Sequence, residues 1–185
     1  MNQINTLERT ASSERLRVGV VGVGYLGRFH ALIYSRMAAV ELVGVVDTDL
    51  ERAHAVATEA GCACYAQLTD LIGLVDAVSV VVPTTAHLQV AAPLLTHGIP
   101  VLLEKPIAPT FAEGAEIVRL AQAHGALLQI GHVERFNAGV MALAQRIDSP
   151  LYIEAQRMGS FVERATDVDV VSDLMIHDID IILSL

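Results

Sequence analysis

Short apolar runs alternate with amphipathic segments along most of the chain. The runs at 16–22, 41–47 and 76–82 are rich in valine and carry few polar positions, which is typical of parallel strands buried on both faces. Each run is followed by a segment whose apolar residues recur at helical spacing. The pattern predicts strands at 16–22, 41–47, 62–66, 76–82, 99–103 and 126–131, a helical turn at 69–73, and helices at 25–37, 50–60, 85–97, 110–124 and 135–146. This alternation predicts an α/β fold with a doubly wound parallel sheet.

The pattern changes near residue 148. The segment Asp-Ser-Pro at 148–150 carries turn residues and is the best position for a domain boundary. Beyond it we expect one strand at 151–158 and one helix at 173–185, which are too little to bury a core of their own. We therefore expect a flexible polar arm, a complete α/β domain, and the truncated beginning of a second α/β domain, at 1–15, 16–148 and 149–185.

A glycine-rich turn joins the first expected strand to the first expected helix. Its sequence is Gly22-Val-Gly24-Tyr25-Leu26-Gly27. An acidic residue follows at the end of the second strand, and this combination is the fingerprint of a dinucleotide-binding Rossmann domain. The first glycine permits the tight turn, the second lets backbone N–H groups approach the pyrophosphate, and the third lets helix pack on strand. We therefore predict that all of these residues except the valine bind the cofactor.

The acidic residue, Asp47, indicates which dinucleotide binds. Its carboxylate can accept hydrogen bonds from both hydroxyls of the adenosine ribose, whereas a 2′-phosphate there would meet a like charge. No basic residue follows it directly, because Thr48 and Asp49 come next. The nearest base, Arg52, is interpreted as part of a solvated helix face. We expect NAD rather than NADP.

Composition and charge narrow the class of partner. The net charge is −9 and the basic residues form no cluster, which gives little electrostatic reason to bind nucleic acid or anionic lipid. No apolar run approaches the roughly 18 residues of a membrane span, and the N-terminus has no apolar signal segment. Cys62 and Cys64 provide neither a disulfide framework nor a metal-ligand set. We expect a cytoplasmic protein that acts on a small molecule, with no nucleic acid, membrane or metal.

The chain has a single lysine among its 12 Lys and Arg residues. Lys105 lies in Glu104-Lys105-Pro106, directly after the fifth expected strand. The carboxyl ends of parallel strands line the ligand crevice, so this turn is predicted to place Lys105 beside the nicotinamide. A buried ammonium can lose its proton, whereas a guanidinium effectively cannot. A charged pair on a surface loop is the alternative.

The last expected helix carries a polar stripe. Asp173, His177, Asp180 and Ser184 share one face at helical spacing, and leucine and isoleucine occupy most of the remainder. We expect a polar stripe on so apolar a helix to face a cleft. The alternative is ordinary capping by Asp173, with His177 on a wet surface.

Together these features resemble the glucose-fructose oxidoreductase, inositol dehydrogenase and MocA family over nearly all of 16–185. The matching pieces are the glycine turn, Asp47, Val82-Pro83 followed by a helix with His87, Glu104-Lys105-Pro106, and Asp173-x-x-x-His177. The resemblance implies an NAD-dependent dehydrogenase acting on CH–OH, with Lys105, Asp173 and His177 as its catalytic residues. It also implies a homo-oligomer for the full-length chain. The family commonly has Asn after Pro83, where this chain has Thr84.

The resemblance suggests further site residues. The cofactor site is predicted to be completed by Pro83, Thr84, His87, Glu104 and Lys105. Core or surface packing is the alternative for His87. The histidines His30, His54, His97 and His124 are assigned to helix faces. His132, at a strand end, is expected either to support the site as a polar residue or to contact the substrate.

The segments 131–137 and 173–180 look most like the branch that acts on nucleotide sugars, such as UDP-N-acetylglucosamine. We expect oxidation of a secondary hydroxyl to a keto sugar. Arg135 and Asn137 are candidates for binding the substrate, or else for shaping a helix entry. The alternatives are an inositol or simple-sugar dehydrogenase, and a dinucleotide-binding module without turnover.

Overall fold

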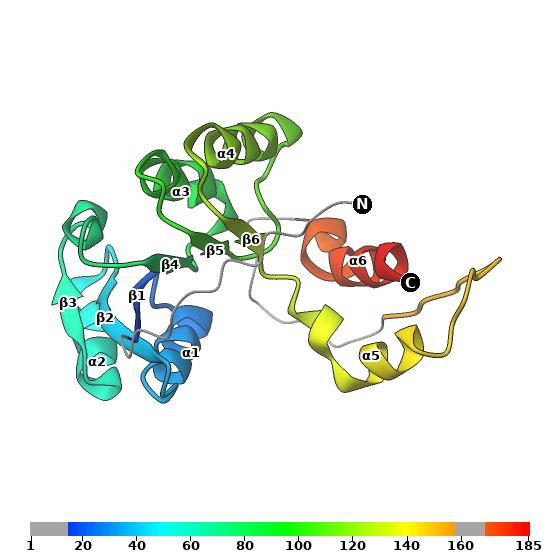
Figure 1. The fold of residues 1–185 in the computed structure, drawn as a ribbon, viewed down its shortest axis with the longest axis horizontal. Coiled ribbons are helices and arrows are strands. Elements are labelled where there is room, and N and C mark those ends of the chain that lie inside the picture. Colours follow the sequence, from blue (N-terminus) through cyan, green and yellow to red (C-terminus); the bar gives the residue numbers. More distant parts are fainter. Residues whose placement is uncertain (1–14, 158–168) are drawn as a thin grey trace, which may run out of the picture.

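The computed structural model describes residues 15–157 and 169–185. Six parallel strands form one sheet in the order β3-β2-β1-β4-β5-β6 (Figure 1). The order reverses between β1 and β4, and the carboxyl ends of strands at such a switch point border the ligand crevice of a doubly wound sheet. The strands are β1 (Leu16–Val21), β2 (Val40–Val46), β3 (Ala63–Tyr65), β4 (Ala77–Val80), β5 (Val101–Leu103) and β6 (Leu128–Ile130).

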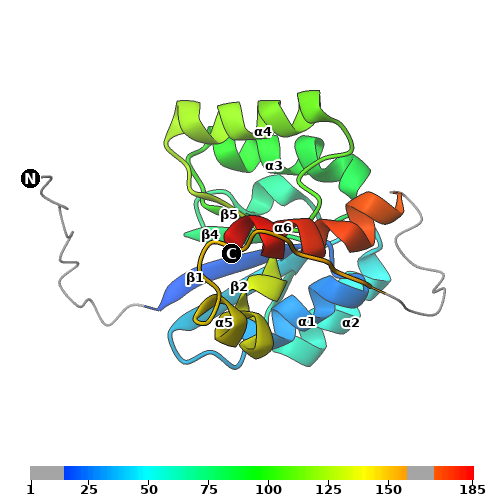
Figure 2. The same cartoon turned by 90° about the vertical axis from the view of Figure 1, so that its right-hand side faces the viewer.

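Helices cover both faces of the sheet. On one face lie α1 (Tyr25–Tyr34) and α2 (Leu50–Ala60), and on the other lie α3 (His87–Thr96) and α4 (Phe111–His124), as Figures 1 and 2 show. Each face has its own apolar cluster, with Val20 and Val45 fully buried in one and Leu94 and Leu103 in the other. Burying each such side chain is worth about 1.5–3 kcal/mol. The predicted fold class is confirmed.

Local sequence places the boundaries of α2 where the pattern predicted them. The Asp49 side chain caps the first turn by accepting a hydrogen bond from the backbone N–H of Arg52. Gly61 ends the helix in a left-handed conformation, at φ 70°, which glycine adopts without a steric penalty. The expected edge strand and the expected helical turn are also present, as β3 and as a 3₁₀ turn at Leu68–Leu71.

The region after β6 differs from the expectation. The helix expected at 135–146 is divided into a 3₁₀ turn, Val133–Phe136, and α5 (Ala138–Ala144), because the backbone at Asn137 is extended. The strand expected at 151–158 is wrong for residues 151–157, which form no strand; residue 158 lies outside the described residues. A strand needs a neighbour for its ladder of hydrogen bonds, and no strand in the described ranges pairs with this segment.

The helix expected at 173–185 begins earlier and in another conformation. Val171–Met175 form a π-helical turn that continues into α6 (Ile176–Ser184). α6 contacts the turn at Val133–Phe136 and lies beyond β6 in Figure 1. None of the helices described is long and apolar enough to cross a membrane. Nearly all of the expected N-terminal arm, residues 1–14, lies outside the described residues.

Candidate active site

The glycine turn after β1 leaves room for a dinucleotide. Gly22 has φ 82°, and a Cβ there would lie 2.5 Å from the carbonyl oxygen of Val81. A Cβ at Gly27 would lie 1.8 Å from the Gly22 oxygen, so α1 packs this closely only with glycine at that position. No heavy atom lies within 4 Å of a Cβ built on Gly24. Two glycines therefore shape the turn, and the third leaves the open space that an approaching pyrophosphate needs.

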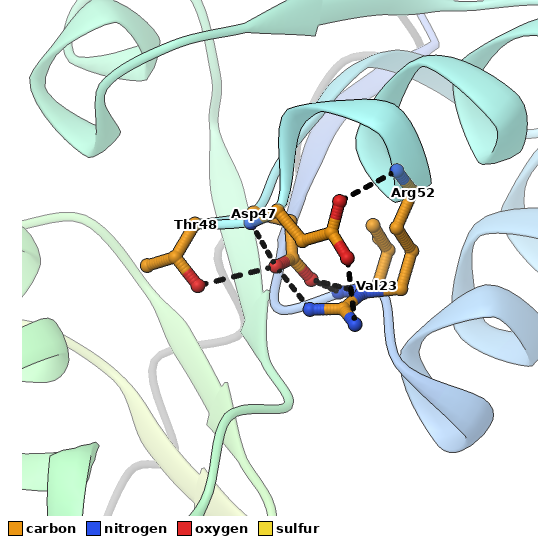
Figure 3. Close-up of polar contacts among 5 residues, drawn as sticks. Val23, Asp47, Thr48 and Arg52 are labelled. Carbon is orange, nitrogen blue, oxygen red and sulfur yellow. Dashed lines mark hydrogen bonds and ion pairs between the residues drawn. The ribbon is translucent and has the colours of Figure 1, made fainter.

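Asp47 lies at the end of β2, with its carboxylate against this turn (Figure 3). It is 7% exposed and accepts hydrogen bonds from the backbone N–H groups of Val23, at 2.7 Å, and Asp49, at 2.9 Å. Burial alone would raise the pKa of Asp47, but the hydrogen bonds from Arg52 and from these backbone groups together lower it. The carboxylate is therefore held ionised as a hydrogen-bond acceptor.

Arg52 lies on an exposed helix face, as expected, but it also binds this carboxylate. Its Nε and Nη2 atoms donate to Asp47 at 3.2 and 2.6 Å, because the long side chain reaches back over the first turn of α2 (Figure 3). An ionised carboxylate offers about four acceptor positions, and two backbone donors and two guanidinium donors fill them, with the Thr48 hydroxyl a longer fifth contact at 3.4 Å. Ribose hydroxyls would therefore have to replace Arg52. The Arg52 side chain is 44% exposed and also lines a cavity of about 400 Å³ beside Gly24.

Lys105 joins the turn after β5 to the last helical segment. Its Nζ atom donates to the backbone oxygen of Asp173 at 2.7 Å and to Oδ1 of the same residue at 2.9 Å. The side chains of this pair are only 16% and 27% exposed. The ammonium is thus partly buried against a residue 68 positions away, which contradicts the alternative of a charged pair on a surface loop.

His177 lies four residues after Asp173, and one of its ring nitrogens makes no hydrogen bond in the described part of the chain. Its Nδ1 atom is buried and has no hydrogen-bond partner among the described residues. Burial lowers the pKa of His177, and the positive charges of Lys105 and Arg157 lower it further. A neutral imidazole can accept a proton, as a general base must.

Two arginines fasten α6 to the rest of the molecule. Arg135 donates two hydrogen bonds, at 2.7 and 2.6 Å, to Asp180, which is 7% exposed. Arg157 holds Asp178 through contacts of 2.8 to 3.2 Å. Asn137 caps α5 by accepting the N–H of Gly139 at 2.9 Å, so the helix-entry alternative describes its place in this structure.

The polar side of the last helical segment faces the Rossmann domain at two positions, Asp173 and Asp180, which contact Lys105 and Arg135. Ser184 departs from this stripe, because it is exposed at the end of α6 and donates to the carbonyl of Ile181. Most of the apolar side chains face outward. Those with exposed fractions of 37–80% are Val170, Val171, Leu174, Met175, Ile179, Ile182 and Leu183.

His87 lies under the loops that follow β4 and β5. It is 1% exposed, and its ring nitrogens lie 3.2 Å from the carbonyl oxygen of Ile107 and 3.1 Å from that of Val82. The alternative of core packing therefore describes His87, which joins the two loops. Thr84, the residue after Pro83, is also buried.

His30 belongs to the site, although its sequence position indicates only a helix face. His30 and Ser79 belong to a buried polar group that includes Glu104. Gly27 and Ala31 are the buried residues of α1, and the neighbouring position of His30 on the sheet side of this helix was the available signal. Across the described ranges, no three side chains of His, Cys, Asp or Glu lie close enough to hold a metal ion.

Comparison with known proteins agrees with this geometry. Residues 16–132, more than half of the chain, match the family described as "Oxidoreductase family, NAD-binding Rossmann fold". UDP-N-acetylglucosamine 3-dehydrogenase of Acidithiobacillus ferrooxidans is 41% identical over 171 residues, which are 92% of this chain and 54% of that protein. Inositol 2-dehydrogenase of Ralstonia nicotianae is 34% identical, over 90% of this chain and 53% of that protein. The chain thus spans about half the length of the curated relatives it matches.

Solved structures give the same picture. A structure of the Acidithiobacillus ferrooxidans enzyme matches 92% of this chain and 56% of its own, with a TM-score of 0.85 and 41% identity. GenD2 from gentamicin A biosynthesis, solved in complex with NAD, matches 72% of this chain and 39% of its own, with a TM-score of 0.69 and 28% identity. The chain therefore belongs to the NAD-binding oxidoreductase family of glucose-fructose oxidoreductase, inositol dehydrogenase and MocA.

Proposed function

We propose that this protein oxidises a secondary hydroxyl of a nucleotide sugar, such as UDP-N-acetylglucosamine, to a keto sugar with NAD as the oxidant. The observation that carries the proposal is the contact between Lys105 and Asp173, with His177 one turn further along the same helical segment. The likeness to UDP-N-acetylglucosamine 3-dehydrogenase supports a nucleotide sugar as the substrate.

The cofactor residues support binding of NAD in a defined direction. The N-terminus of α1 follows Gly24, where open space and backbone N–H groups suit a pyrophosphate. The Asp47 carboxylate would accept the ribose hydroxyls at one end. The turn carrying Glu104 and Lys105 lies at the carboxyl end of β5, and Pro83 and Thr84 follow β4. Tyr25 and Leu26, which begin α1 and are 71% and 50% exposed, border the pyrophosphate turn.

The chemistry follows from three side chains. NAD, when bound, accepts the hydride from the carbon that carries the hydroxyl. His177 takes the hydroxyl proton, since its lowered pKa keeps the ring neutral. Lys105 donates a hydrogen bond to the alkoxide that develops. Asp173 holds the ammonium in position and orients the sugar.

We assign residues 16–148 to the NAD-binding domain and 149–185 to the start of a substrate and oligomerisation domain. The exposed apolar side of α6 supports the second assignment, because such a face is normally covered by further protein. Arg135 contributes by holding Asp180, and Asn137 by starting α5. We also propose that the complete enzyme is a cytoplasmic homo-oligomer.

The test is NADH formation from UDP-N-acetylglucosamine, in this chain and in a chimaera. In the chimaera, residues 16–185 replace the matching part of the Acidithiobacillus ferrooxidans relative, which supplies the remainder of the pocket. We expect turnover in the chimaera that disappears with Lys105→Met and survives the control Arg119→Ala on the exposed side of α4. NADH binding without turnover of any sugar would favour a dinucleotide-binding module instead.

An inositol dehydrogenase is the second candidate, because a relative with that activity is 34% identical over 90% of the chain. The same assay distinguishes the two functions when myo-inositol and simple sugars are offered beside the nucleotide sugar. A preference for inositol in the chain or in the chimaera would replace the nucleotide-sugar proposal.

A further inference from the structure

Four side chains from three elements form a polar array between α1 and the sheet. The Nε2 atom of His30, on α1, lies 3.2 Å from Oε1 of Glu104, which follows β5. The Nδ1 atom of His30 lies 3.3 Å from Oγ of Ser79, on β4, and the hydroxyl of Tyr34 lies 2.7 Å from the same Oγ. Ser79 has no exposed surface, and the side chains of His30 and Glu104 are only 20% and 14% exposed. The mechanism above uses none of His30, Ser79 and Tyr34.

The ionised state of Glu104 determines which atom donates in its contact with His30. Burial alone would raise the pKa of Glu104, but the hydrogen bond from His30 and the nearby backbone N–H of Lys105 help to lower it, so the carboxylate is ionised. An ionised carboxylate only accepts, so Nε2 of His30 must carry the hydrogen. The Oγ of Ser79 is the partner of both Nδ1 of His30 and the Tyr34 hydroxyl. Each polar side chain of the array therefore has a hydrogen-bond partner within it.

The Glu104 carboxylate is held from several sides. His30 donates to it from α1, and the nearby backbone N–H of Lys105 helps to lower its pKa. Gly131 also lies beside it, where an added Cβ would be only 3.0 Å from Oε1. The carboxylate therefore has little freedom, and because Glu104 and Lys105 are consecutive residues of one turn, fixing Glu104 also fixes the backbone that carries the lysine side chain. Beyond the turn, the ammonium of Lys105 extends to Asp173.

We propose that His30 is a positioning residue for Lys105. By donating from Nε2 to Glu104, it fixes the turn from which the Lys105 side chain reaches Asp173, and it joins that turn to the helix that begins at the pyrophosphate site. The importance of this role for turnover rests on the proposed function; the positioning itself does not. Loss of the donor should loosen the Lys105 side chain while leaving the glycine turn and Asp47 intact.

The single lysine of the chain makes this directly measurable. An amine-specific acylating reagent can modify only Lys105 and the N-terminal amine, and peptide mass spectrometry separates the two. The rate of modification reports how often Nζ leaves Asp173. In His30→Leu we expect a rise of about threefold to tenfold over the parent, by local opening of a partly buried contact. His30→Gln, whose amide can still donate to Glu104, should restore most of the parent rate.

Two further variants define the control and the mechanism. His54→Leu removes an exposed histidine from α2 and should leave the rate unchanged. Ser79→Ala removes the partner of Nδ1 and of the Tyr34 hydroxyl but keeps the contact between His30 and Glu104, so it should raise the rate in the same direction but less. Thermal unfolding is recorded for every variant, and Ser79→Ala together with His30→Gln carries the test if His30→Leu does not fold.

The result that overturns the proposal is a parent-like modification rate in a folded His30→Leu protein. Failure of His30→Gln to restore the rate would equally assign His30 to packing. In the chimaera, His30→Leu should lower kcat with the Kd for NADH nearly constant, and should have no further effect once Lys105 is Met, because both changes act through one side chain. Absence of sugar turnover would count against the proposed function, while the modification rates would still decide the role of His30.

Discussion

The glycine turn at 22–27 and the group of Lys105, Asp173 and His177, here called the Lys105 cluster, lie in the same fold but are built in different ways. The turn lies within one strand–turn–helix unit, and its shape is imposed by close backbone packing: a Cβ at Gly27 would lie 1.8 Å from the Gly22 oxygen, and one at Gly22 would lie 2.5 Å from the Val81 oxygen after β4. The cluster joins Lys105 to Asp173 across 68 positions, through a helical segment whose apolar side is largely exposed. The first region is determined by backbone packing. The second depends on long-range ion pairs.

This difference has a physical consequence. A backbone clash cannot be relieved by a small shift, because covalent geometry and the packing of α1 on β1 oppose it. Ion pairs between partly exposed side chains contribute less, typically about 0–1 kcal/mol when exposed. The cofactor turn should therefore persist under changes that displace the last helical segment, and the following predictions test that contrast.

The largest effect should come from His177→Ala. Removing a general base lowers turnover by about 10²- to 10⁴-fold, whereas the Kd for NADH should hardly change, because His177 lies outside the glycine turn. The kinetic assay is run on the chimaera, and NADH fluorescence is titrated on both proteins. His124→Ala, an exposed histidine at the end of α4, is the control. Equal losses of turnover and NADH affinity would contradict the separation of the two regions.

The pH dependence of turnover should also identify His177 as the base. The pKa of His177 is lowered from its ordinary 6.5, so the ring remains neutral and able to accept a proton somewhat below pH 6.5. Turnover of the chimaera should persist there and fall as the pH drops through the lowered pKa, because the protonated ring is no longer a base. In His177→Ala this acid limb should disappear. An acid limb that lies above pH 6.5 would assign the base to another group.

Substituting Gly27 should mainly affect folding, whereas substituting Gly24 should mainly affect NADH binding. Gly27→Ala places a Cβ in contact with the Gly22 oxygen and should cost about 2–4 kcal/mol of unfolding free energy, by overpacking against backbone. Gly24→Ala meets no atom within 4 Å and should change stability by less than about 0.5 kcal/mol, yet it should weaken NADH binding by filling the space for the pyrophosphate. Denaturant unfolding and NADH titration measure the two effects. A stable Gly27→Ala protein would mean that α1 can shift.

The sequence predicted the local region far better than the distant one. Period and turn residues placed all six strands, and the glycine spacing predicted the tight turn at Gly22 and the close packing at Gly27. The pairing of Arg52 with Asp47 was missed, since a rotamer decides whether a long side chain reaches back or points to solvent. The strand at 151–158 was wrong because period alone does not supply a partner strand. His30 was missed because Ser79 and Glu104 meet it only in the folded sheet.

A smaller effect is expected from Asp47→Asn. The amide has one acceptor oxygen in place of two, so it cannot accept from Val23, Asp49 and both ribose hydroxyls together. Hydrogen bonds to a charged group are worth about 1.5–3 kcal/mol, which corresponds to roughly a tenfold to 150-fold loss of NADH affinity. Glu51→Gln makes the same charge change at an exposed position of α2 and serves as the control. Unchanged affinity in Asp47→Asn would mean that the ribose binds elsewhere.

The smallest effect should be that of Arg52→Ala, and its sign is informative. Arg52 fills the two acceptor positions of Asp47 that the ribose hydroxyls need, so its removal should strengthen NADH binding. The gain should be no more than about fivefold, because an ion pair with a half-exposed arginine is worth only about 0–1 kcal/mol. The difference between parent and variant should also shrink as salt is added, since screening weakens the pair that the ribose must break. NADH titration at low and high salt measures both effects, with Arg119→Ala, from an exposed pair on α4, as the control. A loss of affinity greater than about tenfold would reverse the conclusion, because an exposed pair alone does not account for so large a change, and would place the guanidinium in direct contact with the dinucleotide.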